Sequence, residues 1–238
     1  MFSGNFIYSC RMKFTTFVAL LLLSNQCFAN SLQNSLEAIE SEWANIYYKM
    51  AKQEQKSAYP YLLDKAVKLS SQYSEQAEPL FWQAVIKATY AEYQDAISAL
   101  ESIHEARDLL IKAISIDPNT MNGSAYVTLG TLYYRVPKWP IAFGDNAKAK
   151  QMLETALKIN PNGVDANYYY GDFLLSNNQI TEAEHYLTKA AEVRIEANQS
   201  YTDFRLKEEA KFALLKAKSK KISRAKGLLS LFQSSKIK

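Results

Sequence analysis

Cysteine, glycine and proline are all scarce in this 238-residue sequence, which contains 2, 7 and 6 of them. Glycine makes up about 3% of the chain, against an average near ~7%. So few turn-forming residues argue against a many-stranded β protein and against a glycine-rich phosphate-binding fold. The 48% of apolar and 22% of charged residues are ordinary for a globular protein. We therefore expect a folded, helical domain.

The first 29 residues have the pattern of a secretory signal peptide. Lys13 supplies a positive charge, residues 14–23 form a largely apolar run, and Cys27 and Ala29 are small residues placed for cleavage before Asn30. The run is shorter than the ~20 apolar residues that span a membrane. We predict that the signal peptide is removed and the protein is periplasmic; the alternative is an uncleaved N-terminal anchor.

Both cysteines, Cys10 and Cys27, lie in this leader. The mature chain would then contain no cysteine, which excludes a disulfide, thiol catalysis and a cysteine-ligated metal. Lipid attachment at Cys27 is disfavoured, because residues 24–26 lack the small residues and the leucine of a lipoprotein signal. Met1 and Met12 are both candidate start sites.

The same apolar spacing recurs four times along the chain. Apolar residues stand at relative positions 0, 3, 4, 7 and 8, which is the stripe of an amphipathic helix. The copies begin at Tyr59, Ala106, Ala149 and Ala183. Two of them end in a similar way, at residues 116–119 and 159–162, where a proline stops the helix.

A second helix type lies between these copies and carries a glycine, at Gly130 and at Gly171. Glycine at these places allows two helices to approach closely. The distance from Ala156 to Ala190 is 34 residues, and the sequence there resembles the tetratricopeptide repeat. We therefore predict an all-α, tetratricopeptide-like solenoid of helical hairpins over residues 30–217. An unrelated helical bundle is the alternative.

Residues 135–145 form an unusual insertion between two repeat helices, with the sequence RVPKWPIAFGD. Together with residues 160–174 it looks like the T component of TPR-associated TRAP transporters, the TatT-like family. This resemblance implies a periplasmic accessory of solute uptake that binds a transporter's solute receptor, a small ligand, or both. Members of the family are often lipoproteins, and this chain departs from that pattern, because the residues before Cys27 do not fit a lipoprotein signal. A general envelope scaffold that binds peptides or proteins in its groove is the alternative.

The candidate binding residues come from the expected concave face and from the insertion. Tetratricopeptide solenoids line that face with the first helix of each pair, so we expect a patch there of aromatic and charged side chains. The insertion adds two aromatic rings whose simplest role is to cover the core beside Gly130; facing a partner is the alternative. The candidates are Tyr134, Arg135, Trp139, Phe143, Asp165, Tyr168 and Asp172.

Charge is distributed unevenly along the chain. Residues 30–204 carry 15 basic and 22 acidic side chains, whereas residues 205–238 carry 11 and 2. We expect residues 200–217 to form a C-terminal capping helix, because solenoids need one for solubility. The basic tail, residues 218–238, is expected to be disordered or to make weak contact with a membrane surface. The acidic body argues against a nucleic-acid partner.

Catalytic signatures are missing from the sequence. The two histidines, His104 and His185, have no ligand partners at metal-site spacing. No nucleophile-elbow, zinc-protease or phosphate-loop pattern is present. We therefore expect a binding protein that is not an enzyme and needs no cofactor or metal.

Overall fold

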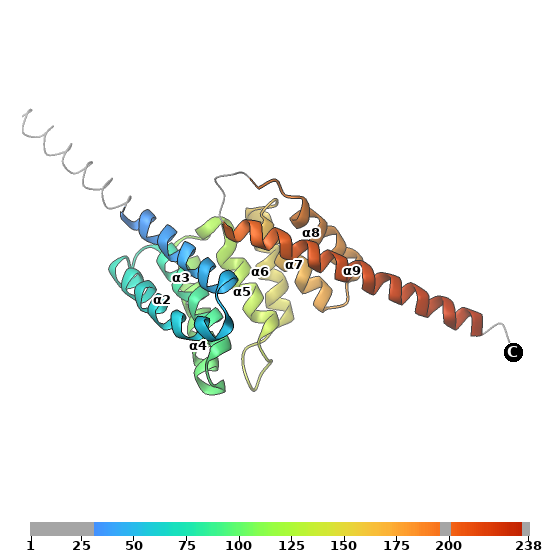
Figure 1. Cartoon of the computed structure of the whole chain (residues 1–238), viewed down its shortest axis with the longest axis horizontal. Helices are drawn as coiled ribbons and strands as arrows, with labels where there is room; N and C mark the ends of the chain where they lie inside the picture. Colours follow the sequence, from blue (N-terminus) through green and yellow to red (C-terminus); the bar gives the residue numbers. More distant parts are fainter. Residues whose placement is uncertain (1–30, 196–200, 235–238) are drawn as a thin grey trace, which may run out of the picture.

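The computed structural model describes residues 31–195 and 201–234, with side chains described up to residue 222. The predicted signal peptide and both cysteines lie outside these residues. A first helix spans residues 31–49. The following elements are α2 (Lys52–Gln72), α3 (Ala77–Tyr90), η1 (Ala91–Tyr93), α4 (Ala96–Ile116), η2 (Thr120–Gly123), α5 (Ser124–Arg135), α6 (Asn146–Ile159), α7 (Val164–Ser176), α8 (Ile180–Glu192) and α9 (Tyr201–Ser234) (Figure 1).

Successive helices pack against one another as a row of hairpins. The pairs α3–α4, α5–α6 and α7–α8 are the most closely packed, together with α9 on α8. Helix α9 also contacts α7 and runs along the C-terminal end of the row (Figure 1). The predicted all-α, tetratricopeptide-like fold is confirmed.

The four predicted stripes supply the centre of the core. In α4, α6 and α8 the residues at relative positions 0, 4 and 7 are completely buried, whereas in α2 the buried residues stand at positions 0, 3 and 7. This equivalence shows that the apolar spacing marks one structural unit used repeatedly. The residues are Tyr59, Leu62 and Ala66 in α2, then Ala106, Leu110, Ala113, Ala149, Leu153, Ala156, Ala183, Leu187 and Ala190.

The two helical glycines occupy equivalent close contacts. A Cβ atom at Gly130 would stand 2.8 Å from the Cγ of Leu153, and one at Gly171 would stand 2.7 Å from the Cγ of Leu187. Leu153 and Leu187 hold the same position in their stripes. The hairpins α5–α6 and α7–α8 therefore each close through a glycine on the first helix and a leucine on the second.

The N-terminal helix completes the core at the other end of the chain. Trp43 packs against Trp82 of α3 with ring centroids 5.9 Å apart, and its indole Nε1 donates to Thr89 Oγ1 at 3.2 Å. Among the described residues no helix is both long and apolar enough to cross a membrane.

Helix α9 departs from the sequence prediction. Leu206, Ala210 and Ala217 are buried against the body, as a capping helix requires. The helix does not end there, however, and its backbone stays helical through Ser234. The basic segment expected as a separate tail from residue 218 is thus a continuation of α9 as far as Ser234.

Candidate partner-binding surfaces

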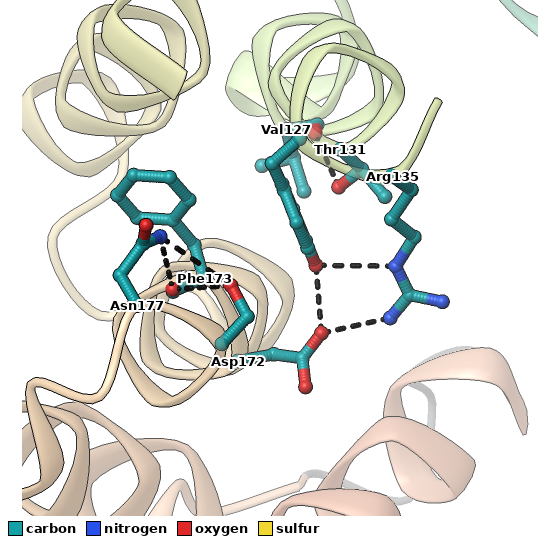
Figure 2. A network of polar contacts seen from close by, with 8 residues as sticks. Val127, Thr131, Arg135, Asp172, Phe173 and Asn177 are labelled. Carbon is teal, nitrogen blue, oxygen red and sulfur yellow. Dashed lines mark hydrogen bonds and ion pairs between the residues drawn. The ribbon is translucent and has the colours of Figure 1, made fainter. Parts of the chain in front are cut away.

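Three of the predicted site residues form one polar network between α5 and α7 (Figure 2). The Tyr134 hydroxyl donates to Asp172 Oδ2 at 2.7 Å, and an Arg135 guanidinium nitrogen donates to the same oxygen at 2.8 Å. Arg135 Nε also donates to the Tyr134 hydroxyl oxygen at 3.2 Å. One carboxylate oxygen therefore ties the end of α5 to the middle of α7.

The ends of these helices hold the network in place. Asn177 donates its amide to the carbonyl of Phe173 at 2.8 Å and so closes α7 one turn beyond Asp172 (Figure 2). In α5, the Thr131 hydroxyl donates to the Val127 carbonyl at 2.8 Å. These bonds lie within each helix, whereas the contact between the two helices is made by Tyr134, Arg135 and Asp172 themselves.

Asp165 and Tyr168 are also on α7, but they are covered. Ser124 donates to Asp165 Oδ2 at 2.5 Å, which fastens α7 to the start of α5. Tyr168 is buried and hydrogen-bonds to Glu209 of α9. The predicted open groove on this face is therefore wrong, because α9 packs on it.

The N-terminal helix meets α9 at the same place. Tyr48 makes an edge contact with Tyr201, with ring centroids 6.1 Å apart, and the Arg205 guanidinium lies 5.1 Å from the centre of the Tyr48 ring. The end of the N-terminal helix and the first turns of α9 thus meet beside α7. Sequence reasoning missed this contact, because the two helices are separated by 150 residues with no shared motif.

Burial changes the acidity of the carboxylates along α9. Desolvation raises the pKa of Asp203 to about 6, with smaller contributions from the negative charges of Asp165 and Glu40. Burial also raises the pKa of Asp165, which the Ser124 hydrogen bond opposes, and that of Glu209, which Tyr168 opposes in the same way. Ionising these groups therefore weakens the packing of α9.

The insertion is a compact loop closed at its base. The Gly144 amide donates to the Pro137 carbonyl at 2.9 Å, and the Asp145 amide donates to the Tyr133 carbonyl at 2.8 Å. Asp145 then accepts from the amides of Ala147 and Lys148 at 2.9 and 3.1 Å, which starts α6. These hydrogen bonds fix the two ends of the loop, where it joins α5 and α6.

Two side chains of this loop point into solvent and one is anchored. Trp139 is 86% exposed and Ile141 is 63% exposed. Phe143 instead packs edge-on against His104 and Tyr133, at 5.0 and 5.6 Å between ring centroids. The simplest expectation, that the loop aromatics cover the core, is therefore wrong for Trp139 and describes Phe143.

The predicted site is thus divided into two places. Tyr134, Arg135 and Asp172 meet between α5 and α7, whereas Phe143 lies against α4. The Arg107 guanidinium of α4 lies 4.6 Å from the Phe143 ring centre and covers it. The charged network and the apolar loop do not form the single patch expected from the sequence.

An apolar hollow adjoins the anchored side of the loop. It has a volume of about 330 Å³ and lies between α4, α5 and α6. Tyr133 belongs both to its wall and to the contact with Phe143, so the hollow and the loop are neighbours. The stripe spacing indicated the individual helices but gave no signal for this gap. It is lined by Ile111, Ile114, Tyr126, Leu129, Tyr133, Lys148, Gln151 and Met152.

The histidines occupy packed positions. His104 makes an edge contact with Phe143, and His185 makes one with Tyr186, each at 5.0 Å between ring centroids. Within residues 31–195 and 201–222, no group of three or more His, Cys, Asp or Glu side chains is arranged to hold a metal.

These features define a tetratricopeptide-like repeat protein with an added surface loop. The tetratricopeptide repeat family matches residues 141–194, which run from the loop through α6, α7 and α8. This is a repeat that builds a scaffold and not an enzyme family. No curated protein matches the sequence. A solved structure of MamA is 20% identical, covering 74% of this chain and 95% of that one, with a TM-score of 0.43.

Proposed function

We propose that this protein is a non-catalytic binding protein that docks a folded protein partner through the loop at residues 136–145. The observation that carries the proposal is the exposure of Trp139 at the tip of a loop whose base is closed by hydrogen bonds. Tryptophan is enriched among the residues that dominate binding energy at interfaces. A loop already fixed in one conformation loses little entropy on binding, which favours affinity.

The hollow beside Tyr133 extends this surface. A partner that covers Trp139 and Ile141 can place an apolar side chain in the hollow, whose volume is in the range of small-molecule sites. Lys148 and Gln151 on its wall can orient polar groups of the partner or of a small amphipathic ligand.

The TatT-like resemblance supplies the identity of the partner. We propose that the chain is exported to the periplasm and binds the solute receptor of a TRAP transporter. The loop is the most specific part of that resemblance, and two of its apolar residues, Trp139 and Ile141, face solvent. The second candidate is a general envelope scaffold. It would use the same loop, because α9 and residues 31–49 occupy the face where a peptide groove was expected.

The test measures capture and stability on the same variants. Trp139→Ala should melt with the wild type but lose affinity for a purified TRAP solute receptor from the same organism by roughly thirtyfold. Tyr61→Ala is the matched control, because Tyr61 is an aromatic that is 74% exposed on α2. It should bind as the wild type does.

Three outcomes separate the candidates. Loss of receptor binding with Trp139→Ala alone supports the TatT-like function. A wild-type protein that ignores the receptor but crosslinks to other envelope proteins through position 139 supports the scaffold. Equal binding by wild type and Trp139→Ala contradicts both.

A further inference from the structure

Helix α9 has a second apolar face, turned away from the body. Its inner face is the buried stripe that contains Leu206, Ala210 and Ala217. On the opposite side Phe212 is 72% exposed and Leu215 is 64% exposed. Tyr201, Phe204 and Ile222 are exposed as well.

The spacing of these residues places them in one line. Leu215 follows Phe212 by three residues and Ile222 follows Leu215 by seven, and Tyr201 precedes Phe212 by eleven, which is three turns of α-helix. Tyr201 contacts Tyr48 of the N-terminal helix, so it belongs to the packing of α9 on the body. The other four residues share one side of the helix, here called the outer stripe: Phe204, Phe212, Leu215 and Ile222. Large apolar side chains gathered in this way on a surface usually mark a binding site.

Lysines border the outer stripe on both sides. By helical position, Lys211 and Lys218 lie along one edge and Lys216 along the other. Lys216 and Lys218 make no ion pair among the side chains that the structure describes. Glu208 lies within the stripe, four residues from both Phe204 and Phe212, and its charge is paired with Lys211 at 2.6 Å.

The C-terminal part of α9 carries charge of one sign only. From Lys211 to the last residue the sequence has nine basic side chains and no acidic one. A second copy of α9 laid against the outer stripe would bring lysines against lysines, which is repulsive. An anionic surface would instead be attracted along both edges.

We propose that the outer stripe of α9 is a docking face for an anionic membrane surface. An amphipathic helix binds in this way when its aromatic and aliphatic side chains enter the headgroup region and its lysines meet the phosphates. Each lysine near such a surface strengthens binding about fivefold. The site differs from the basic tail expected from the sequence, because its apolar part begins at Phe204, before that tail, and lies on the side of α9 opposite the buried residues. It does not depend on the loop that carries Trp139.

The experiment is co-sedimentation of the purified full chain with vesicles. Wild type should bind vesicles of equal parts phosphatidylglycerol and phosphatidylcholine, bind pure phosphatidylcholine much less, and release on addition of salt. The double variants Phe212→Ser with Leu215→Ser, and Lys216→Glu with Lys218→Glu, should each lose affinity for the mixed vesicles by at least about tenfold.

Matched controls are exposed residues on α4. Ile97→Ser removes an apolar side chain that is 81% exposed, and Lys112→Glu reverses an exposed lysine. Both should bind the mixed vesicles as the wild type does. All variants should melt with the wild type, and Leu215→Ser alone replaces the double serine variant if that one unfolds.

Two results would overturn the proposal. One is a wild-type chain that fails to bind the mixed vesicles, or α9 variants that bind them as well as wild type. The other is a wild-type dimer that the outer-stripe substitutions dissociate without any change in vesicle binding, which would assign the stripe to a second copy.

Discussion

Trp139 and Phe143 are four residues apart on one loop and have opposite environments. Phe143 is held between His104, Tyr133 and the Arg107 guanidinium, whereas Trp139 is almost fully exposed. The loop closes through backbone hydrogen bonds, so its shape does not depend on burying the indole. Packing and binding roles can therefore be separated residue by residue.

This difference predicts that alanine substitutions at the two positions affect stability to different extents. Trp139→Ala should change the free energy of unfolding by less than about 0.5 kcal/mol, as surface substitutions usually do. Phe143→Ala should cost about 1–3 kcal/mol, because a half-buried ring loses part of what a core phenylalanine contributes. Urea denaturation of both variants measures this, and a Trp139→Ala protein that is the less stable of the two would return the indole to the core.

At the residue scale, sequence reasoning predicted which side chains interact better than it predicted which side chains are exposed. It grouped Tyr134, Arg135 and Asp172, because helical register and one repeat step place them on the same face. It expected Tyr168 to line an open groove, and Tyr168 is buried. Exposure depends on which distant segment covers a residue, and α9 carries no signal for where it packs.

At the element scale, the repeat helices follow from their spacing. The alanines at positions 0 and 7 of the stripes in α4, α6 and α8 are fully buried, since a neighbouring helix lies directly against them. The period made α4, α6 and α8 predictable. Helix α3 was not, because its stretch of sequence carries neither the stripe nor the glycine.

Ala156→Leu tests this interpretation of the stripe. Ala156 is fully buried in α6, so the larger side chain should overpack the contact and cost about 1–3 kcal/mol. Ala147→Leu, at an exposed position of the same helix, is the control and should change stability little. Thermal melting that shows the two variants to be equally stable would mean that the register assigned to α6 is incorrect.

At the scale of the whole molecule, the end of the N-terminal helix and the start of α9 meet beside α7. Tyr48, Tyr201 and Arg205 form the contact, and Asp203 and Glu209 lie along the same helix. Carboxylates with raised pKa values gather here, because closing the two helices over α7 removes water from them. The stability of this contact between the N-terminal helix and α9 therefore depends on pH.

The sign of this dependence follows from Asp203. Its pKa in the folded protein is about 6, above the ~3.9 of an unfolded chain, so the folded state holds the proton more tightly. The stabilisation from this group is complete below about pH 4 and is lost as the pH rises through about 6.

Asp203→Asn should abolish the loss of stability that ionisation of Asp203 causes at higher pH. Because Asp203 is partly exposed, solvent screening limits the gain to about 1 kcal/mol at pH 7, with little difference from wild type near pH 4. Urea denaturation at both pH values measures the effect, with Asp64→Asn on the exposed face of α2 as the control. A gain that is equal at both pH values would contradict the assignment to ionisation.

The proposal that the loop docks a protein partner is tested most directly by photocrosslinking in living cells. A photoreactive phenylalanine analogue would replace Trp139 in one variant and Ile97, which is also strongly exposed, in another. We predict one dominant adduct from position 139, identified by mass spectrometry as a TRAP solute receptor, and none from position 97. The same adducts from both positions, or none from position 139, would contradict the account.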